Sequence, residues 1–455
     1  MDAISFGTDG WRARLDVFTD ERVRMVGQAV ADYLAEEGVD APVAVGYDAR
    51  VTSEGFAESL GDVLAGNGFD VWLSDRDCPT PVVAWGVVDC DLAGALMITA
   101  SHNPPEYNGV KFIPGNGAPA LPAVTDAIEA RLADPSTDGP QGSVTRVDFV
   151  AAHADQARDA IDPDCAGLTV VYDAMHGSGR DVTDALLESA GATVFRRRCE
   201  RDASFGGGSP EPSAERLAGL VDAVGAHDAD LGVANDGDAD RLAVVTPDRG
   251  VLDENLFFAA VYDALLESDA GPAVRSVSTT FLIDRVADAH GEEVIETPVG
   301  FKWIAEAMVE ADALIGGEES GGFSLRGHVP EKDGVVMALL AADMTAAEPL
   351  DRRVDRLLDA HGAIVADKVS VDCPDDRKTA VVDGLGDVLP ASIAGRAVDD
   401  VITLDGFKLL LSDGSWLLIR PSGTEPKMRV YAEARSRERV DALLDEGRDL
   451  VAGLV

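Results

Sequence analysis

The sequence contains very little lysine. Only seven of its 455 residues are lysine, and lysine and arginine together number 38 against 82 aspartates and glutamates, which gives a formal net charge of −44. Because 46% of the residues are apolar, the composition is not that of a disordered chain, so the negative charge must lie on folded surfaces. Such a surface repels itself at low salt and binds nucleic acid and anionic membranes poorly. We therefore expect a halophilic, cytoplasmic protein, with an acidic protein of ordinary salt tolerance as the alternative.

Cysteine is scarce as well, and its spacing suits no metal or disulfide framework. The five cysteines stand singly, with no CxxC or Cys/His pattern, which argues against a zinc site. No apolar run is long enough to span a membrane, and the segment MDAISFGTDGWR lacks the pattern of a signal peptide. We expect neither a membrane nor a nucleic acid as partner, and the sequence predicts no particular oligomeric state.

Three segments of the chain share one pattern. Each has a β-rich strand, an amphipathic helix that ends at glycine, and a second strand. Each then reaches a further strand that ends in a polar loop. The repeats begin at 43–50, 168–179 and 276–284, and their polar loops follow strands that start near residues 91, 228 and 311.

This repeat predicts the fold class. Strands that alternate with helices form parallel α/β sheets, in which ligands gather at the carboxyl ends of the strands. From about residue 365 the pattern changes to antiparallel strands with Asp-Gly turns, followed by a helix over 437–451. We predict three similar mixed α/β domains around a central cleft and a smaller C-terminal α+β domain, with limits at 1–150, 151–252, 253–363 and 364–455.

The loop Asn235-Asp236-Gly237-Asp238-Ala239-Asp240-Arg241 places three carboxylates at alternate positions after an apolar strand. Anions packed so closely need a neutralising cation, and oxygen ligands favour Mg²⁺, Mn²⁺ or Ca²⁺. An EF-hand is excluded, because its glycine position holds Arg241 and its final glutamate position holds Pro247. The alternative is a solvated acidic loop. The strand-end position favours a metal site at Asp236, Asp238 and Asp240.

The loop RPSGTEPKMR, residues 420–429, gathers cations in an otherwise acidic protein. Hydroxyl groups, the backbone N–H groups around Gly423 and three cations suit a phosphate, although the Walker A pattern is missing. A decorated hairpin turn is the alternative. The residues concerned are Arg420, Ser422, Gly423, Thr424, Lys427 and Arg429.

Two further loops carry polar groups next to glycine. In GGEESGG, residues 316–322, Glu318 and Ser320 alternate to one side and suit sugar hydroxyls, although a glycine-rich turn with a capping serine reads equally well. In FGTDGWR, residues 6–12, Arg12 is a candidate phosphate clamp, although alone it would be a surface arginine.

Ser101 lies where an apolar strand ends, in LMITASHNPPEYNGVKF. The ordinary role of such a serine is to cap a turn. A serine hydroxyl becomes a nucleophile only with a base or a metal, and acyl transfer would need a G-x-S-x-G elbow, which is absent. With a metal loop and a phosphate-binding loop elsewhere in the chain, phosphoryl transfer through Ser101 is the better interpretation. Lys111 follows ten residues on, and His102 either orients Ser101 or packs.

Together, TASHNPPEYNGVKF, DGDADR, GEESGG and RPSGTEPKMRVY resemble, in this order, the four signature loops of the α-D-phosphohexomutases, the phosphoglucomutase and phosphomannomutase superfamily. The resemblance covers essentially the whole chain. It implies a phosphorylated Ser101 that binds one Mg²⁺ per chain together with Asp236, Asp238 and Asp240. It also implies that Lys111 and Arg12 act beside Ser101 as general acid/base and charge clamp.

The resemblance implies roles for the remaining motif residues. Arg241 would position the phosphoserine and the metal loop. Substrate contacts would come from Thr297, Gly300 and Lys302 for sugar orientation, Glu318 and Ser320 for the O3 and O4 hydroxyls, and the residues of loop 420–429 for the phosphate that is not transferred. Two departures are Ala239, where many members have glycine, and Gly322, where some have histidine. His328 is a candidate for the missing imidazole.

The implied reaction interconverts hexose 1-phosphate and hexose 6-phosphate through a bisphosphosugar, with glucose 1,6-bisphosphate as primer and intermediate. Phosphoglucomutase is the first expectation. The alternatives are a phosphomannomutase or dual-specificity enzyme, a phosphoglucosamine mutase, a serine-based phosphatase, and a sugar-phosphate-binding protein without catalysis.

Overall fold

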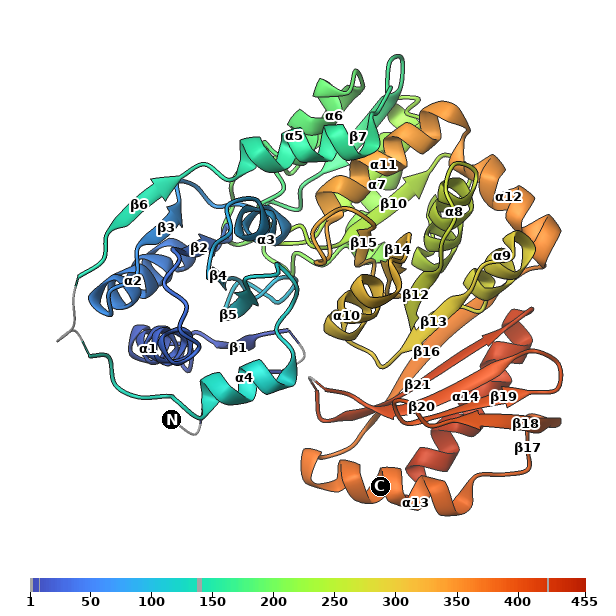
Figure 1. The fold of residues 1–455 in the computed structure, drawn as a ribbon. Helices are drawn as coiled ribbons and strands as arrows, with labels where there is room; N and C mark the ends of the chain where they lie inside the picture. The colour runs from blue at the N-terminus through green and yellow to red at the C-terminus, as the bar shows by residue number, and fades with distance from the viewer. Residues whose placement is uncertain (1–2, 8, 137–140, 424) are drawn as a thin grey trace.

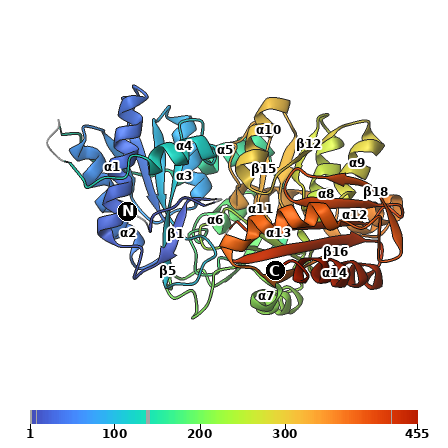
Figure 2. The same ribbon diagram turned by 90° about the horizontal axis from the view of Figure 1, so that it is seen from below.

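The computed structural model describes residues 3–7, 9–136, 141–423 and 425–455. Within these ranges, four β-sheets of six, five, four and six strands follow one another along the chain. In the views of Figure 1 and Figure 2 the blue first unit lies at the left and the red fourth unit at the right. No helix in the described part is long and apolar enough to cross a membrane.

The first sheet has the strand order β1-β5-β4-β2-β3-β6. Its central strands VAVGY and GALMI are buried along their whole length, as expected of parallel strands covered on both faces. Helices α1 and α2 pack on each other and α2 lies on the sheet. The elements are β1 (Trp11–Arg14), α1 (Asp20–Glu36), β2 (Val43–Tyr47), α2 (Ser53–Gly66), β3 (Val71–Ser74), α3 (Thr80–Asp89), β4 (Gly94–Ile98), β5 (Tyr107–Pro114), α4 (Pro122–Glu129) and β6 (Val144–Val147).

The second sheet has the order β11-β10-β9-β7-β8 and follows the helix α5 (Val150–Ile161). The third sheet has the order β13-β12-β14-β15. The elements of the second unit are β7 (Thr169–Asp173), α6 (Thr183–Ser189), β8 (Thr193–Arg197), α7 (Ala214–Ala226), β9 (Leu231–Asn235), β10 (Leu242–Thr246) and β11 (Gly250–Val251). Those of the third are α8 (Glu254–Leu266), β12 (Ala273–Ser276), α9 (Leu282–His290), β13 (Val294–Thr297), α10 (Phe301–Ala311), β14 (Ile315–Gly317), β15 (Phe323–Leu325), α11 (Gly334–Ala347) and α12 (Leu350–His361).

The threefold repeat of the sequence is a repeat of topology. In each unit the first strand (β2, β7, β12) lies between the second (β3, β8, β13) and the third (β4, β9, β14), and all three run parallel. A fourth strand (β5, β10, β15) returns antiparallel beside the third. The hairpin loop between the third and fourth strands is therefore equivalent in all three units. These loops carry Ser101, the three aspartates 236, 238 and 240, and Glu318.

The fourth sheet is antiparallel, with the order β16-β21-β20-β19-β18-β17. The predicted α/β units and the smaller α+β unit are thereby confirmed, and the predicted closing helix over 437–451 is α14. The elements are β16 (Val365–Asp372), α13 (Asp375–Val388), β17 (Ser392–Ile393), β18 (Arg396–Ile402), β19 (Phe407–Leu411), β20 (Trp416–Pro421), β21 (Lys427–Ala434) and α14 (Arg437–Ala452).

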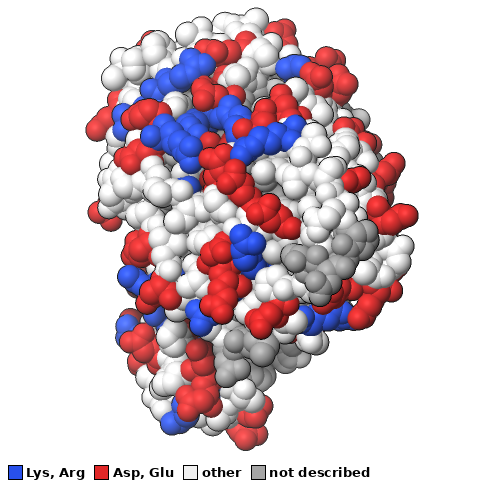
Figure 3. All heavy atoms as spheres, turned by 90° about the vertical axis from the view of Figure 1, so that its left-hand side faces the viewer, with Lys and Arg blue, Asp and Glu red and all other residues white. Residues whose placement is uncertain are grey.

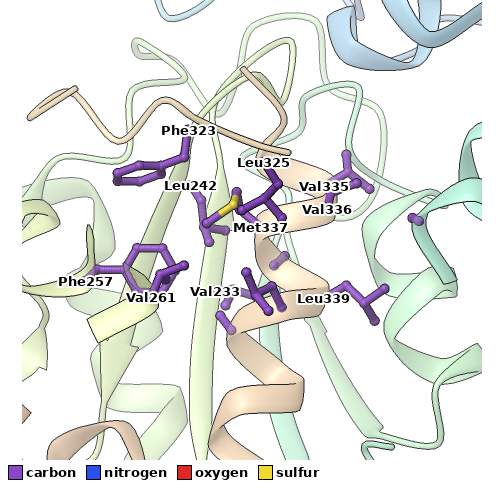
Figure 4. Close-up of a cluster of buried hydrophobic side chains, with 14 of the residues drawn as sticks. Val233, Leu242, Phe257, Val261, Phe323, Leu325, Val335, Val336, Met337 and Leu339 are labelled. Carbon is purple, nitrogen blue, oxygen red and sulfur yellow. The ribbon is translucent and has the colours of Figure 1, made fainter. Parts of the chain in front are cut away.

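Helix α11 joins the second and third units through one core. Its sequence GVVMALLAADMTAA is apolar on nearly all sides, as is typical of a fully buried helix. Figure 4 shows its side chains between strands of the second sheet and elements of the third unit, with Met337 facing Leu242 and Leu325. The acidic loop after β9 and the glycine-rich loop after β14 are thus held by a shared core.

Candidate active site

Ser101 and Asp236 come from equivalent loops of the first and second units and touch each other. The hydroxyl of Ser101 donates a hydrogen bond to Oδ2 of Asp236 over 2.7 Å, and both side chains are buried. The loops approach so closely that a Cβ on Gly237 would lie 2.5 Å from the main-chain oxygen of Ser101. The repeated topology thus places the serine against the acidic loop.

Ser101 is held in a left-handed backbone conformation, with φ of 50°. Non-glycine residues adopt this conformation seldom, and it persists where surrounding contacts impose it. The main-chain N–H of Ser101 donates to Oγ1 of Thr99 over 2.8 Å, and Thr99 in turn donates to the buried carboxylate of Asp48. Although it stands in a turn, the side chain of Ser101 is buried against the acidic loop.

Arg50 holds the rest of the serine loop, and no motif of the sequence pointed to it. Its guanidinium is 1% exposed, pairs with Asp48 over 2.9 Å and stacks on the ring of Phe205. Its remaining N–H groups donate to main-chain oxygens along the serine loop, namely those of Ser101, Asn103, Pro104 and Tyr107. One buried cation therefore fixes the backbone of the loop.

His102 lies beside the serine hydroxyl, with 3.3 Å between its Nδ1 and Oγ of Ser101. Burial, together with the nearby cations Arg241 and Arg12, lowers the pKa of His102 to about 2. The imidazole is therefore neutral at any physiological pH. It is placed to orient the hydroxyl, which is one of the two roles that the sequence left open.

The three aspartates of the acidic loop fit a divalent cation. Their ligand atoms lie within 4.8 Å of one another and their side chains are fully buried. Among the described residues, Oδ1 of Asp238 and Oδ1 of Asp240 have no hydrogen-bond partner. Burial and the neighbouring carboxylates of Asp240 and Asp238 raise the pKa of Asp236 well above its usual value. A buried anionic cluster with unpartnered oxygens is what Mg²⁺ neutralises.

Lys111 lies among these carboxylates. Its Nζ is 2.9 Å from Asp9, 3.2 Å from Asp238 and 3.0 Å from Asp240. Although burial opposes it, the three carboxylates raise the pKa of Lys111 well above its usual value, so the side chain is an ammonium group. Asp9 pairs with this lysine at the shortest of the three distances. It belongs to the segment FGTDGWR, in which the sequence had suggested a role only for Arg12.

Lys332 is a second cation in the same place. Its Nζ lies 3.0 Å from Asp240 and 3.3 Å from Asp9, and its side chain is 5% exposed. A Cβ on Gly322 would lie 2.5 Å from Cδ of Lys332, so this lysine occupies the space that a side chain at position 322 would need. The scarcity of lysine was the signal that could have identified it.

His328 lies elsewhere. Its Nε2 is 2.7 Å from Oδ2 of Asp333 and its ring stacks on Trp85, with the side chain 1% exposed. In the structure it is Lys332, and not His328, that fills the space over Gly322.

Arg12 and Arg241 border the acidic loop from two units. Arg12 pairs with Asp9 over 2.8 Å and reaches Asn103 of the serine loop over 3.4 Å. The Nε of Arg241 lies 3.9 Å from Asp240. The backbone of Arg241 forms an isolated antiparallel β-bridge with that of Gly322. Arg12 therefore lies against the serine loop, and Arg241 lies beside Asp240 of the acidic loop.

The glycine-rich loop faces the loop 297–302. Oε1 of Glu318 accepts a hydrogen bond from the N–H of Gly300 over 3.0 Å, and Oε2 accepts one from Ser320 over 3.4 Å. Burial raises the pKa of Glu318 and lowers that of the half-buried Lys302. Thr297 is buried at the end of β13. The structure thus brings Glu318, Ser320 and Gly300 together, with Thr297 and Lys302 on either side of Gly300 in the chain.

The loop 420–429 contacts the third unit through Asp405. This carboxylate pairs with Arg420 over 2.8 Å and accepts a hydrogen bond from the N–H of Val299 over 3.1 Å. Lys427 and Arg429 both pair with Glu425 of the same loop. Thr424 lies outside the described residues.

Lys378 of α13 supports this loop and was not predicted. Its Nζ donates hydrogen bonds of 2.6 Å to the main-chain oxygens of Ser422 and Glu425. Ser422 is buried and Gly423 is exposed, so the loop presents the backbone at Gly423 to solvent.

Comparison with known proteins gives matches along the whole chain. Family models described as phosphoglucomutase/phosphomannomutase match in four parts: α/β/α domain I over residues 3–138, domain II over 147–250, domain III over 253–361 and the C-terminal domain over 369–450. These four models are in the order of the four sheets.

Relatives of this chain are named for different substrates. The "Probable phosphoglucosamine mutase" of Methanopyrus kandleri is 34% identical over 98% of this chain and 97% of its own length. Two proteins of Thermococcus kodakarensis, a phosphoglucomutase/phosphomannomutase and a phosphopentomutase, are each 32% identical, covering 98% and 99% of this chain and 98% of their own lengths. A crystal structure from Thermus thermophilus, of a protein whose name assigns it to the phosphomannomutases, is 32% identical, covers 99% of both chains and has a TM-score of 0.87.

Proposed function

From the premise that this chain belongs to the phosphoglucomutase/phosphomannomutase family, we propose that it interconverts hexose 1-phosphate and hexose 6-phosphate through a phosphoserine at Ser101. The family makes it a mutase, that is, an isomerase. The observation that carries the proposal is the 2.7 Å hydrogen bond from Ser101 to Asp236, which places a nucleophile against a cluster of three carboxylates. Glucose phosphates are the first proposed substrate, and mannose or glucosamine phosphates are the alternatives.

The proposed chemistry exchanges one phosphorus–oxygen bond for another. In the first half, the bond from phosphorus to Oγ of Ser101 breaks and a bond to the free 1- or 6-hydroxyl of the sugar forms. The sugar hydroxyl loses its proton and Oγ of Ser101 gains one, and the second half reverses these changes at the other end of the bisphosphosugar. Lys111, as an ammonium group held among carboxylates, is the proposed proton donor to Ser101, and Arg12 offsets negative charge on the transferring group.

Asp236, Asp238 and Asp240, with Ser101, would hold one Mg²⁺. When bound, it would offset the charge of the transferring phosphoryl group. The unpartnered oxygens of Asp238 and Asp240 support this assignment. Arg241 and Lys332 add positive charge on the side of the glycine-rich loop.

The remaining residues would hold the substrate. Glu318 and Ser320 are proposed to bind the O3 and O4 hydroxyls, with Thr297, Gly300 and Lys302 orienting the sugar. Arg420, Ser422, Gly423 and Thr424 would bind the phosphate that is not transferred. Lys427 and Arg429 would reach it by exchanging Glu425 for phosphate oxygens, because both pair with that carboxylate.

The acidic surface agrees with a cytoplasmic setting, and a small anionic substrate would be held by cations of the site such as Lys111 and Lys332. On the face drawn in Figure 3, acidic side chains are spread over most of the surface, whereas many of the basic ones gather in the upper part of the view. With a net charge of −44, binding to nucleic acid or an anionic membrane is disfavoured. We place the domain limits at 1–150, 151–252, 253–363 and 364–455.

A coupled assay tests the function. Purified protein with Mg²⁺ and a trace of glucose 1,6-bisphosphate should convert glucose 1-phosphate faster than mannose 1-phosphate or glucosamine 1-phosphate. Intact-mass measurement should find one phosphoryl group that Ser101→Ala removes. Preference for glucosamine 1-phosphate would overturn the substrate assignment. Release of free phosphate without isomerisation would indicate a phosphatase. If no phosphoprotein or exchange appears, the chain is a sugar-phosphate-binding protein.

A further inference from the structure

Two histidines from distant segments share one carboxylate in the interior. Nε2 of His153 lies 2.6 Å and Nε2 of His328 lies 2.7 Å from Oδ2 of Asp333, and all three side chains are at most 1% exposed. His153 belongs to α5, between the first and second units, and Asp333 caps α11 in the third. Trp85 of the first unit stacks on His328. The cluster therefore ties three units together.

The hydrogen-bond pattern assigns both imidazoles as donors to an anionic Asp333. Its other oxygen, Oδ1, accepts from the N–H groups of Val335 and Val336 at the start of α11. Although burial opposes it, the hydrogen bonds from His153 and His328 lower the pKa of Asp333. The carboxylate thus stays charged because four donors surround it.

A metal ion does not suit this cluster. A metal on Nε2 would leave Nδ1 of each ring protonated, and such a group normally finds an acceptor. In the described part of the chain, Nδ1 of His153 and Nδ1 of His328 have no partner. As unprotonated nitrogens beside donating Nε2–H groups, they leave no buried N–H of either ring unpaired. The separations of 2.6 and 2.7 Å are hydrogen-bond lengths.

The residues on either side of Asp333 reach the active site. The Nζ of Lys332 pairs with the carboxylates of Asp240 and Asp9. The N–H of Gly334 donates to the main-chain oxygen of Ala239 over 3.1 Å. A Cβ on Gly334 would lie 2.3 Å from the main-chain oxygen of Arg241, so the turn fits tightly against the acidic loop. Any movement of Asp333 would therefore displace both Lys332 and that loop.

We infer that His153, Asp333 and His328 are positioning residues that hold Lys332 and the metal-binding loop in register. The inference concerns the same site as the proposed function and rests on it for the catalytic effect. Its effect on metal binding does not depend on which sugar is the substrate.

The test compares two substitutions of His153. His153→Leu keeps the volume but removes the donor, whereas in His153→Gln the amide N–H can reach the position of Nε2. In the absence of substrate, His153→Leu should weaken the binding of Mn²⁺ by about tenfold, as substitution of residues that orient metal ligands does. Electron paramagnetic resonance of the free ion measures this affinity. It should lower kcat by about the same factor with KM within about twofold. His153→Gln should recover most of both, and His290→Gln, at the end of α9, is the matched control.

A double-mutant cycle shows whether His153 acts through Lys332. In the background of Lys332→Met, His153→Leu should lower kcat by a smaller factor than it does alone, because part of its effect passes through Lys332 and only the part through the acidic loop remains. Losses that multiply in full would overturn the inference that the cluster acts through Lys332. Equal Mn²⁺ affinity in folded His153→Leu and the unchanged protein would also overturn it, as would one equivalent of tightly bound zinc that His153→Leu removes. If the unchanged protein shows no mutase activity, the proposed function fails, and the Mn²⁺ titration still decides the positioning role.

Discussion

The guanidinium of Arg50 donates a 2.8 Å hydrogen bond to the main-chain oxygen of Ser101, and both residues are 1% exposed. The same guanidinium pairs with Asp48, which accepts from Thr99, and Thr99 accepts from the N–H of Ser101. Ser101 is thus held through both of its backbone polar groups. In the proposed role of Ser101 as carrier of a phosphoryl group, such a support would favour the reaction, because small displacements cost reaction rate.

Arg50→Met should destabilise the protein and lower the rate of the proposed reaction. The substitution leaves the carboxylate of Asp48 buried without its cation, which should lower the free energy of unfolding by about 3 to 5 kcal/mol. Urea denaturation measures this loss. Arg24→Met is the control, because Arg24 is partly exposed beside Asp20, and its loss should stay within about 1 kcal/mol. Equal losses in the two variants would contradict the supporting role of Arg50.

Asp236→Asn should separate metal binding from stability. Burial and the repulsion of Asp240 and Asp238 disfavour the charge of Asp236, so the metal-free variant should melt no lower than the metal-free unchanged protein. Mg²⁺ at about 100 times its Kd should stabilise the unchanged protein by about 2.7 kcal/mol and the variant hardly at all. Thermal denaturation with EDTA and with Mg²⁺ measures both effects. The control Asp399→Asn, at an exposed position, should be stabilised by Mg²⁺ as much as the unchanged protein. If Mg²⁺ stabilised Asp236→Asn equally, Asp236 would be excluded as a ligand of the metal.

Lys408 should give the protein a stability that changes with pH. Its fully buried Nζ is 2.7 Å from Glu296, and burial together with Arg275 lowers its pKa to about 8, with Glu296 partly opposing. The unfolded chain, with a lysine pKa of about 10.4, binds more protons between pH 8 and 10, so the cost of the buried charge is present below pH 8 and fades as pH rises. Arg275 also pairs with Glu296, which stays ionised without Lys408.

Lys408→Met should therefore be more stable than the unchanged protein at pH 7, by about 1 to 3 kcal/mol. The gain should shrink between pH 8 and pH 10. Urea denaturation of both proteins across this range gives the difference at each pH. The variant Lys368→Met, at an exposed position, is the control for the loss of a lysine. A variant of Lys408 that is less stable at every pH would show that the ion pair outweighs its burial.

Salt should stabilise the folded protein. With a net charge of −44, exposed acids repel one another at low ionic strength, and the screening length falls from about 10 Å at 0.1 M to about 3 Å at 1 M salt. The urea midpoint should therefore rise between 0.1 M and molar KCl. A nonionic osmolyte at equal osmolality, which does not screen charge, should raise it less. An unchanged midpoint would mean that the surface charges are already compensated locally.

Much of the site could be predicted because it lies in loops of a repeated unit. Polar residues at equivalent strand ends predicted that Ser101, the aspartates and Glu318 would share one region, and the hairpin between the third and fourth strands brings them together. The substrate could not be predicted in the same way. Relatives about equally similar to this chain are named for glucosamine, hexose and pentose phosphates.

Local patterning of the sequence was sufficient to determine the strands, the helices, the repeat and the chemistry of each loop. The spacing of residues along a helix or a strand determines which of them share a face. Contacts between elements depended on the tertiary structure. Lys332 and Asp9 are 323 positions apart, and nothing in the spacing of either indicates that they meet. Arg50, Lys378 and the His153–Asp333–His328 cluster were likewise found only in the folded chain. A buried charge is defined by what surrounds it, and packing of distant segments alone supplies those surroundings.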